Sequence, residues 1–171
     1  MKRLTVLRHA KSSWGDTKLD DFDRPLNDRG RQAARRMGRE IKRRTMRFDL
    51  VLASTAARVR ETLDCVQEKY DFDAPIRFEP LIYMAAADTL LLIVRDIPDE
   101  VNSAMLVGHN PGLEQLLLEL TRDDKEGLRA HIREKYPTGA LAAVELPVKS
   151  WADVEENSGE VKDLILPREL D

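Results

Sequence analysis

The sequence predicts an α/β protein, a three-layer α/β/α sandwich with a mainly parallel central sheet. Two observations support this fold class. Short apolar runs alternate along the chain with longer segments whose apolar residues recur at helical spacing. The succession of strand, polar loop and helix also recurs several times. Strands and helices that alternate at these lengths are typical of a mainly parallel sheet covered on both faces.

Six strands are expected. Each is a short apolar run that ends in polar or turn-forming residues. The first run changes abruptly to polar residues at Arg8, and the second ends at Ser54. The expected strands cover residues 4–8, 50–53, 76–78, 104–107, 140–146 and 161–166.

Helices are expected between these strands, because apolar residues recur there three or four positions apart. Asn27 is a suitable N-cap for the first helix, which would reach about Arg44, and Pro111 suits the first turn of another. A charged helical stretch precedes Pro137. The inner faces are expected at Ala33, Ala34, Met37 and Ile41, then at Val59, Leu63, Val66 and Tyr70, then over residues 89–94, and last at Leu113, Leu116, Leu117 and Leu120.

Length and composition predict a single domain over residues 1–171. Hydrophobic residues make up 42% of the chain, which is enough to form a core. The formal net charge of -3 gives no global attraction to nucleic acid or to anionic lipid. No apolar run approaches membrane-spanning length, no secretory signal is recognisable, and Cys65 has no second cysteine to pair with. We therefore expect a cytoplasmic protein that binds neither nucleic acid nor membranes.

Polar side chains follow three of the expected strands. Arg8 and His9 come after the first strand, residues 54–58 after the second, and His109 after the fourth. Ligands of open α/β sheets bind beyond the carboxyl ends of the strands, so these residues should share one rim. The planar forks of Arg8 and Arg58 suit phosphate oxygens. A neutral imidazole can attack phosphorus without first losing a proton, so the rim predicts a phosphate-processing site around His9.

Three segments resemble the signature blocks of the histidine phosphatase superfamily, and they occur in the same order. They are Leu7-Arg8-His9-Ala10, residues 54–62 and Val107-Gly108-His109-Asn110. Within the superfamily, the compact length and two further segments are similar to those of SixA-type phosphohistidine phosphatases. These segments are residues 23–26, with Gly30 following, and residues 137–140. The resemblance implies a phosphoglycerate mutase-like fold and an enzyme that needs neither a metal nor another cofactor.

The resemblance also implies roles for individual residues. His9 would be the phosphorylated nucleophile, Arg8 and Arg58 would hold the phosphoryl oxygens, and His109 would add a donor in the transition state. Ala10 departs from the glycine that many members carry, but alanine is small enough to leave these assignments in place. Ser12 is expected either to contact a phosphate oxygen or to support the loop.

The acid that would protonate a leaving group is not evident. Mutase-like relatives use a glutamate from a longer insertion, whereas residues 77–83 are short here and Glu79 is a weak equivalent. An imidazole leaving group, whose conjugate acid has a pKa of about 6.5, departs with little help. We therefore expect a phosphatase that hydrolyses phosphohistidine on a protein, for example a histidine phosphotransfer protein. The alternatives are a small phosphate ester as substrate, or a non-catalytic phosphate-binding module.

Three other features have competing interpretations. The basic residues between Arg29 and Arg44 indicate a solvated helix face, and the absence of interleaved aromatic residues argues against nucleic acid. An acidic protein partner for this helix stays open. A zinc site made from His9 and His109 is not favoured, because no closely spaced ligand pair accompanies them. Trp14 would either line the pocket or cover the core.

Overall fold

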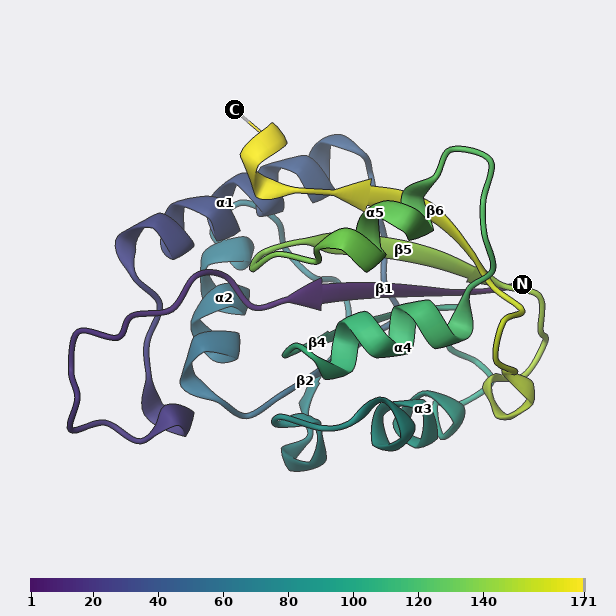
Figure 1. Cartoon of the computed structure of the whole chain (residues 1–171), viewed down its shortest axis with the longest axis horizontal. Helices are drawn as coiled ribbons and strands as arrows, with labels where there is room; N and C mark the ends of the chain where they lie inside the picture. Colours follow the sequence, from purple (N-terminus) through teal and green to yellow (C-terminus); the bar gives the residue numbers. More distant parts are fainter. Residues whose placement is uncertain (171) are drawn as a thin grey trace.

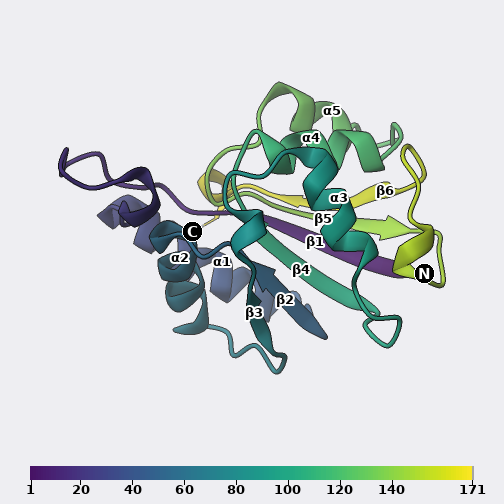
Figure 2. The same cartoon turned by 90° about the horizontal axis from the view of Figure 1, so that it is seen from below.

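The computed structural model, described here for residues 1–170, contains a six-stranded sheet in the order β3-β2-β4-β1-β5-β6 (Figures 1 and 2). Neighbouring strands from β3 to β1 are parallel, whereas β5 is antiparallel to both β1 and β6. The sheet is therefore mainly parallel, as expected. The strands are β1 (Lys2–Arg8), β2 (Leu50–Ala53), β3 (Ile76–Phe78), β4 (Ser103–Gly108), β5 (Leu141–Leu146) and β6 (Glu160–Ile165).

Helices cover both faces of the sheet, which confirms the three-layer arrangement. Figure 2 shows α3, α4 and α5 on one side of the sheet and α1 and α2 on the other. The helices are α1 (Asp28–Arg43), α2 (Ala57–Gln67), α3 (Ala87–Arg95), α4 (Gly112–Leu120) and α5 (Leu128–Glu134). Short 3-10 turns occur at η1 (Asp21–Asp23), η2 (Pro80–Ile82), η3 (Trp151–Asp153) and η4 (Pro167–Glu169).

The side chains of the strands alternate between two hydrophobic cores, one on each face. In β1, Leu4 and Val6 pack into the core beneath α3, α4 and α5, whereas Leu7 packs into the core beneath α1 and α2. In β2, Leu52 likewise packs into the core beneath α3, α4 and α5, and Val51 packs into the core beneath α1 and α2. Because both faces are buried, the central strands are apolar at nearly every position, and this is why their positions could be predicted.

Local signals set the start of α1. The Gly30 N–H donates to Asn27 Oδ1 at 2.8 Å, so Asn27 is the N-cap that the sequence predicts. Three residues of the expected inner faces are placed differently, and one of them, Leu92 in α3, is 67% exposed. Tyr70 lies beyond the end of α2, where its ring packs edge-on against Phe72 and its hydroxyl donates to a backbone carbonyl. Ala33 is only half-buried, because it lines a surface groove.

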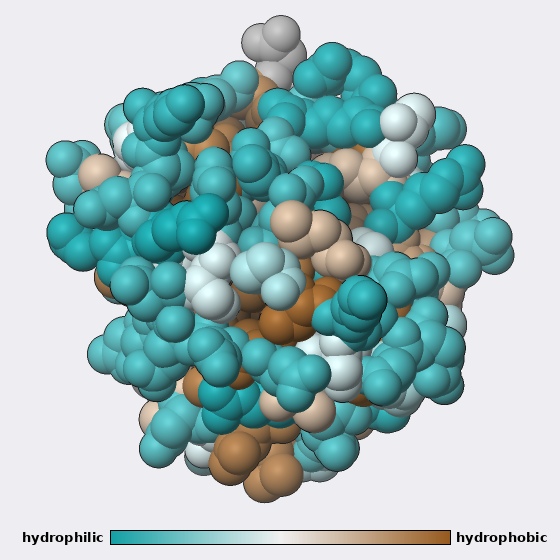
Figure 3. All heavy atoms as spheres, turned by 90° about the vertical axis from the view of Figure 1, so that its right-hand side faces the viewer, coloured by the Kyte–Doolittle hydropathy of each residue, from teal (hydrophilic) through white to brown (hydrophobic). Residues whose placement is uncertain are grey.

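The segment between β1 and α1 positions the functional end of the molecule. It projects past the carboxyl end of β1 and returns to α1 (Figures 1 and 2). A single bridge between Ser12 and Leu26 ties its two arms together. The face at the other end of the sheet is mostly hydrophilic, with apolar atoms visible in a central hollow (Figure 3). Within residues 1–170, none of the helices combines the length and apolarity needed to cross a membrane.

Candidate active site

Four of the expected site residues meet at the carboxyl ends of three neighbouring parallel strands. Arg8 ends β1 and His9 follows it, Arg58 lies in the first turn of α2 after β2, and His109 follows β4. All four line one cavity of about 450 Å³. The ring centroids of His9 and His109 are 5.3 Å apart. Because β4 pairs with both β1 and β2, residues far apart in the sequence reach the same cavity.

The His9 imidazole has a defined tautomer. Its Nδ1 lies 2.7 Å from the carbonyl oxygen of Ala10, and a carbonyl can only accept, so the proton is on Nδ1. Among residues 1–170, nothing hydrogen-bonds to Nε2. Burial, followed by the nearby Arg58 and Arg8 guanidinium groups, lowers the pKa of His9 to about 4. At neutral pH the ring therefore presents an unprotonated Nε2.

The backbone around His9 is held from two sides. The Ala10 N–H donates to Thr62 Oγ1 at 3.0 Å, which ties the loop to α2. The Gly139 N–H approaches the His9 carbonyl oxygen at 2.9 Å. Gly139 has a φ of 77°, a conformation that glycine adopts without steric cost. The segment that connects α5 to β5 therefore supports the turn that carries His9.

A buried guanidinium group, that of Arg58, and a partly buried one, that of Arg8, flank the histidines. Arg58 is 2% exposed, and its Nη1 and Nη2 donate to the backbone oxygen and Oδ2 of Asp21 at 2.8 and 3.0 Å. Arg8 Nη1 donates to the Tyr136 carbonyl oxygen at 3.1 Å. Burial lowers the pKa of Arg8 from its usual value near 12.5, but a guanidinium still stays charged at neutral pH. Two fixed positive charges therefore adjoin the cavity.

Buried polar atoms without partners are concentrated at this cavity. In the described part of the chain, four buried side-chain atoms lack a hydrogen-bond partner, and three of them are Arg8 Nε, Arg58 Nε and His109 Nδ1. Folded proteins leave few such atoms unpaired, because each one loses its hydration without compensation. Their concentration is what a preformed site for an oxyanion requires, since the oxygens of the ligand would complete the missing hydrogen bonds.

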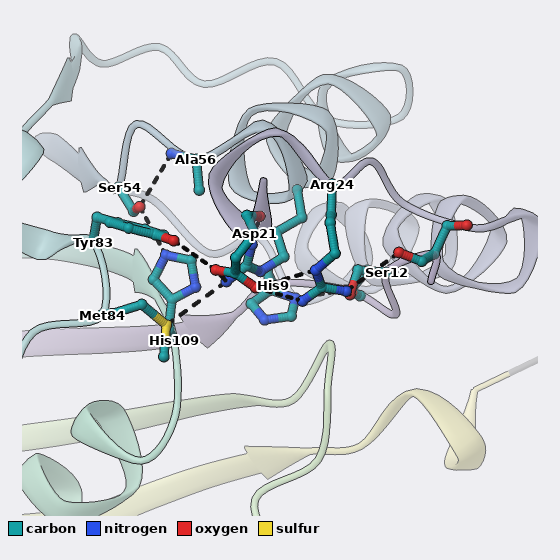
Figure 4. Close-up of polar contacts among 12 residues, drawn as sticks. His9, Ser12, Asp21, Arg24, Ser54, Ala56, Tyr83, Met84 and His109 are labelled. Atoms are coloured by element: carbon teal, nitrogen blue, oxygen red, sulfur yellow. Dashed lines mark hydrogen bonds and ion pairs between the residues drawn. The ribbon is translucent and has the colours of Figure 1, made fainter. Parts of the chain in front are cut away.

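His109 is oriented by the loop after β2 (Figure 4). Its Nε2 lies 2.8 Å from Ser54 Oγ, which itself accepts from the Ala56 N–H. The Ser54 hydroxyl is able to donate to Nε2, and in that arrangement the His109 proton is on the unpaired Nδ1. Burial and the Arg58 charge lower the pKa of His109 to about 3. The ring is therefore neutral and offers its Nδ1 proton as a hydrogen-bond donor.

Sequence reasoning did not assign a role to Asp21, Arg24 or Tyr83, which form a network at the cavity mouth (Figure 4). Asp21 Oδ2 accepts from the Tyr83 hydroxyl at 2.6 Å, and Oδ1 accepts from Arg24 Nε at 3.1 Å. The hydrogen bond from Tyr83, followed by those from Arg58 and Arg24, lowers the pKa of Asp21 to about 2. All three residues lie in or directly after short 3-10 turns, where no periodicity could single them out.

The structure gives different positions to the secondary candidates. Ser12 lines the cavity, but its hydroxyl accepts from Arg24 at 2.8 Å, which favours the loop-supporting role. Trp14 also lines the cavity and stacks against the Arg24 guanidinium, 3.5 Å from the ring centroid. Glu79 does not line the cavity; its carboxylate accepts from the Leu81 N–H at the start of η2. The described residues contain no cluster of three metal-ligating side chains.

Comparisons with known proteins agree with the resemblance in the sequence. Residues 4–82 match the model of the histidine phosphatase superfamily (branch 1), a segment that includes Arg8, His9 and Arg58. An uncharacterized protein from Mycobacterium tuberculosis is 33% identical over 164 residues, which cover 95% of this chain and 100% of that relative.

Two solved structures of candidate SixA phosphohistidine phosphatases are similar over almost their whole length. The one from Agrobacterium tumefaciens is 32% identical with a TM-score of 0.82, and the match covers 97% of this chain and 98% of that chain. The one from Nakamurella multipartitia is 27% identical with a TM-score of 0.84, and the match covers 97% and 96% of the two chains. These similarities also bear out the phosphoglycerate mutase-like fold. The chain belongs to the histidine phosphatase superfamily and is of the SixA type.

Proposed function

We propose that this protein is a phosphatase that hydrolyses phosphohistidine on a protein through a covalent intermediate on His9. The observation that carries the proposal is the unprotonated Nε2 of His9 in a cavity where Arg8, Arg58 and His109 each hold an unpaired polar atom. A nucleophile surrounded by donors is the arrangement that phosphoryl transfer requires, because charge spreads over the equatorial oxygens in the transition state. The SixA names of the similar structures support the same substrate class.

In the first step, the lone pair of His9 Nε2 attacks phosphorus. The bond between phosphorus and the substrate imidazole breaks, and its electron pair stays on that ring nitrogen. The other nitrogen of the substrate ring carries a proton, so the ring leaves as a neutral imidazole and needs no further proton. The guanidinium groups of Arg8 and Arg58 and the Nδ1 proton of His109 hold the phosphoryl oxygens. The phosphorylated His9 ring is cationic, and the Ala10 carbonyl that accepts from its Nδ1 stabilises this charge.

In the second step, water attacks the same phosphorus from the side that the substrate imidazole has left. The bond between phosphorus and His9 Nε2 breaks, the electron pair returns to Nε2, and the proton of the water passes to solvent. Phosphate then leaves, and the neutral imidazole is restored. The burial that lowers the pKa of His9 favours this return, because the ring regains its preferred uncharged form.

The leaving group distinguishes the proposed substrate from the small phosphate ester. An alkoxide needs a proton donor to leave, and Glu79, the glutamate that the sequence offers as a candidate acid, does not line the cavity. An imidazole leaves without such a donor. The cavity therefore suits cleavage of a P–N bond better than cleavage of an alkyl phosphate ester.

The test compares phosphate release by wild type and His9→Ala from a histidine-phosphorylated phosphotransfer protein and from an alkyl phosphate. We expect wild type to release phosphate from the protein, and the alkyl phosphate to be a poor substrate. Rapid quenching should trap an acid-labile, base-stable phosphate on wild type that is absent from His9→Ala. His131→Ala, which removes an exposed histidine, is the matched control and should keep full activity.

Each outcome bears on a separate part of the proposal. Release no greater than that of His9→Ala from either substrate would contradict the enzymatic function and favour a phosphate-binding module. Equal turnover of the alkyl phosphate and the phosphoprotein would contradict the leaving-group argument. Activity without a trapped phosphate on any quenching timescale would contradict the covalent route.

A further inference from the structure

A second hollow, of about 490 Å³, adjoins the active-site cavity and shares Lys11 and Thr138 with it. It lies between the N-terminal half of α1, the segment before β5 and η4. We call it the basic groove, because five cationic side chains and one acidic side chain, Asp28, line it. The cations are Lys11, Arg29, Arg36, Lys135 and Arg168.

The cations of the basic groove have no ion-pair partner in the described part of the chain. Across residues 1–170, no carboxylate lies within ion-pair distance of any of the five, and Asp28 is paired with Arg31 at 3.2 Å. The rest of α1 differs. There, the guanidinium groups of Arg31, Arg35, Arg43 and Arg44 contact Glu61, Glu68 or Glu40. Arg29 and Arg36 therefore line the groove without an ion pair to the described residues, whereas most other arginines of α1 are paired. Arg39 and Lys42 are also without an ion pair among residues 1–170, but they lie outside the groove.

Exposed apolar side chains also border the active-site cavity. Trp14 and Met84 line it and are 75% and 50% exposed. Phe22 packs edge-on against Tyr83 and is itself 38% exposed. Gathered exposed apolar side chains mark surfaces that contact other macromolecules, and aromatic residues and methionine are enriched in protein interfaces. The opening of the cavity is thus bordered by side chains of the kind that contact another protein.

We propose that the basic groove docks an acidic face of the phosphorylated protein substrate while its phosphohistidine enters the active-site cavity. The inference rests on the proposed function and deepens it. A phosphoryl group on a small molecule needs only the active-site cavity and its own donors. The four groove cations that do not line the active-site cavity exceed what one phosphate recruits, whereas several carboxylates on a protein surface would match them. Complementary charge at an interface raises the encounter rate and fixes the orientation of the partner.

The test uses two phosphohistidine peptides of the same length, one with glutamates flanking the histidine and one with glutamines. Arg29→Gln/Arg36→Gln removes two groove cations that do not line the active-site cavity. We expect this variant to lower kcat/KM about tenfold for the glutamate peptide, mainly through KM, and less than about twofold for the glutamine peptide. Added salt should weaken the preference of wild type for the glutamate peptide.

The matched control is Arg39→Gln/Lys42→Gln, which removes the same charge from the same helix outside the groove. It should leave both peptides within about twofold of wild type. An equal loss in the control, or an equal effect on both peptides, would overturn the docking proposal. So would competition by short polyphosphate without any peptide preference, which would indicate a site for small polyanions.

The two proposals fail in distinguishable ways. If wild type hydrolyses both peptides at the same rate and the groove variant changes neither, the docking proposal is wrong and the proposed function stands. If wild type hydrolyses neither peptide above the level of His9→Ala, the proposed function is wrong, and the docking proposal falls with it.

Discussion

His9 and His109 share a cavity with two guanidinium groups, and this neighbourhood determines their protonation. Burial is the largest influence on both pKa values, and Arg58 adds to it. Both rings are therefore neutral well below pH 6.5. A neutral His9 has a lone pair to attack with, and a neutral His109 does not add a further positive charge to a cavity already lined by several cations. The arginines thus serve two purposes, since they attract phosphate and keep the imidazoles uncharged.

Arg58 is the donor whose removal should be most informative. Asp21 engages both of its Nη atoms, which holds the guanidinium in place while Nε remains unpaired. Arg58→Ala should lower kcat/KM for phosphohistidine on the order of 100-fold or more, because a preorganised donor for the transition-state charge is lost. The measurement is steady-state phosphate release, with thermal unfolding to verify the fold.

The matched control for Arg58→Ala lies two residues further along the same helix. Arg60 is exposed and donates to the Thr55 carbonyl oxygen rather than lining the cavity. Arg60→Ala should stay within a few-fold of wild type. A rate for Arg58→Ala equally close to wild type would show that Arg58 does not hold the phosphoryl group.

At the scale of elements, the start of α1 and the turn after β1 are packed backbone to backbone. A Cβ placed on Gly30 would lie 2.1 Å from the carbonyl oxygen of Lys11, and the Asn27 N–H donates to that same oxygen at 3.0 Å. Lys11 directly follows Ala10, whose carbonyl orients His9. The glycine therefore allows the first helix to support the catalytic turn.

Gly30→Ala should destabilise the protein and impair catalysis together. Alanine favours helix by about 1 kcal/mol, but the backbone overlap with Lys11 outweighs this gain. We expect a loss of about 2 kcal/mol or more in the free energy of unfolding, measured in urea, and a loss of kcat/KM of about tenfold. Gly15→Ala is the control, since its Cβ would meet only Ser13 Oγ at 3.3 Å. A Gly30→Ala protein more stable than wild type would contradict this packing argument.

Elements that local burial or capping determines were predicted well, whereas a position that a tertiary contact determines was not. Strands β2 and β3 matched their expected bounds, because burial leaves a local apolar run. The N-cap of α1 could also be predicted, because Asn27 and the N–H that it accepts from are only three residues apart. Tyr70 was misassigned because an aromatic contact with Phe72, rather than helical periodicity, decides its place. A contact between residues outside regular elements leaves no periodic trace in the sequence.

For the whole molecule, the buried histidines make stability depend on pH. The folded-state pKa values of about 4 for His9 and about 3 for His109 lie below the unfolded value of 6.5. As the pH falls through 6.5 toward 4, the unfolded chain therefore binds protons that the native state excludes, and stability decreases. At pH 5 each histidine should cost about 2 kcal/mol relative to pH 7.

Urea unfolding at pH 7.5, 6 and 5 measures this dependence. The double variant His9→Asn/His109→Asn should show a flatter profile over that range, whatever its absolute stability. The pKa of Asp21 is about 2 in the folded state and 3.8 ordinarily. Its contribution to stability is therefore lost only below about pH 4, outside the range of this experiment. A wild-type free energy of unfolding that does not change between pH 7.5 and 5 would contradict the buried neutral histidines.

The sequence by itself determined the order of strands and helices, the mainly parallel sheet and the placing of Arg8, His9, Arg58 and His109 on one rim. These features follow from local patterns, since burial, capping and the ends of strands are marked by neighbouring residues. Because ligands bind at the carboxyl ends of parallel strands, the residues that follow these strands could be predicted to form one site.

Only the tertiary structure decided which polar atoms are paired. It placed the proton of His9 on Nδ1, held Arg58 with Asp21 and kept Glu79 away from the cavity. It also brought five cations together in the basic groove, where no carboxylate of residues 1–170 pairs with them. Each of these depends on side chains that approach from distant parts of the chain. Hydrogen bonds and ion pairs form over a few ångströms in space, and spacing along the sequence does not specify them.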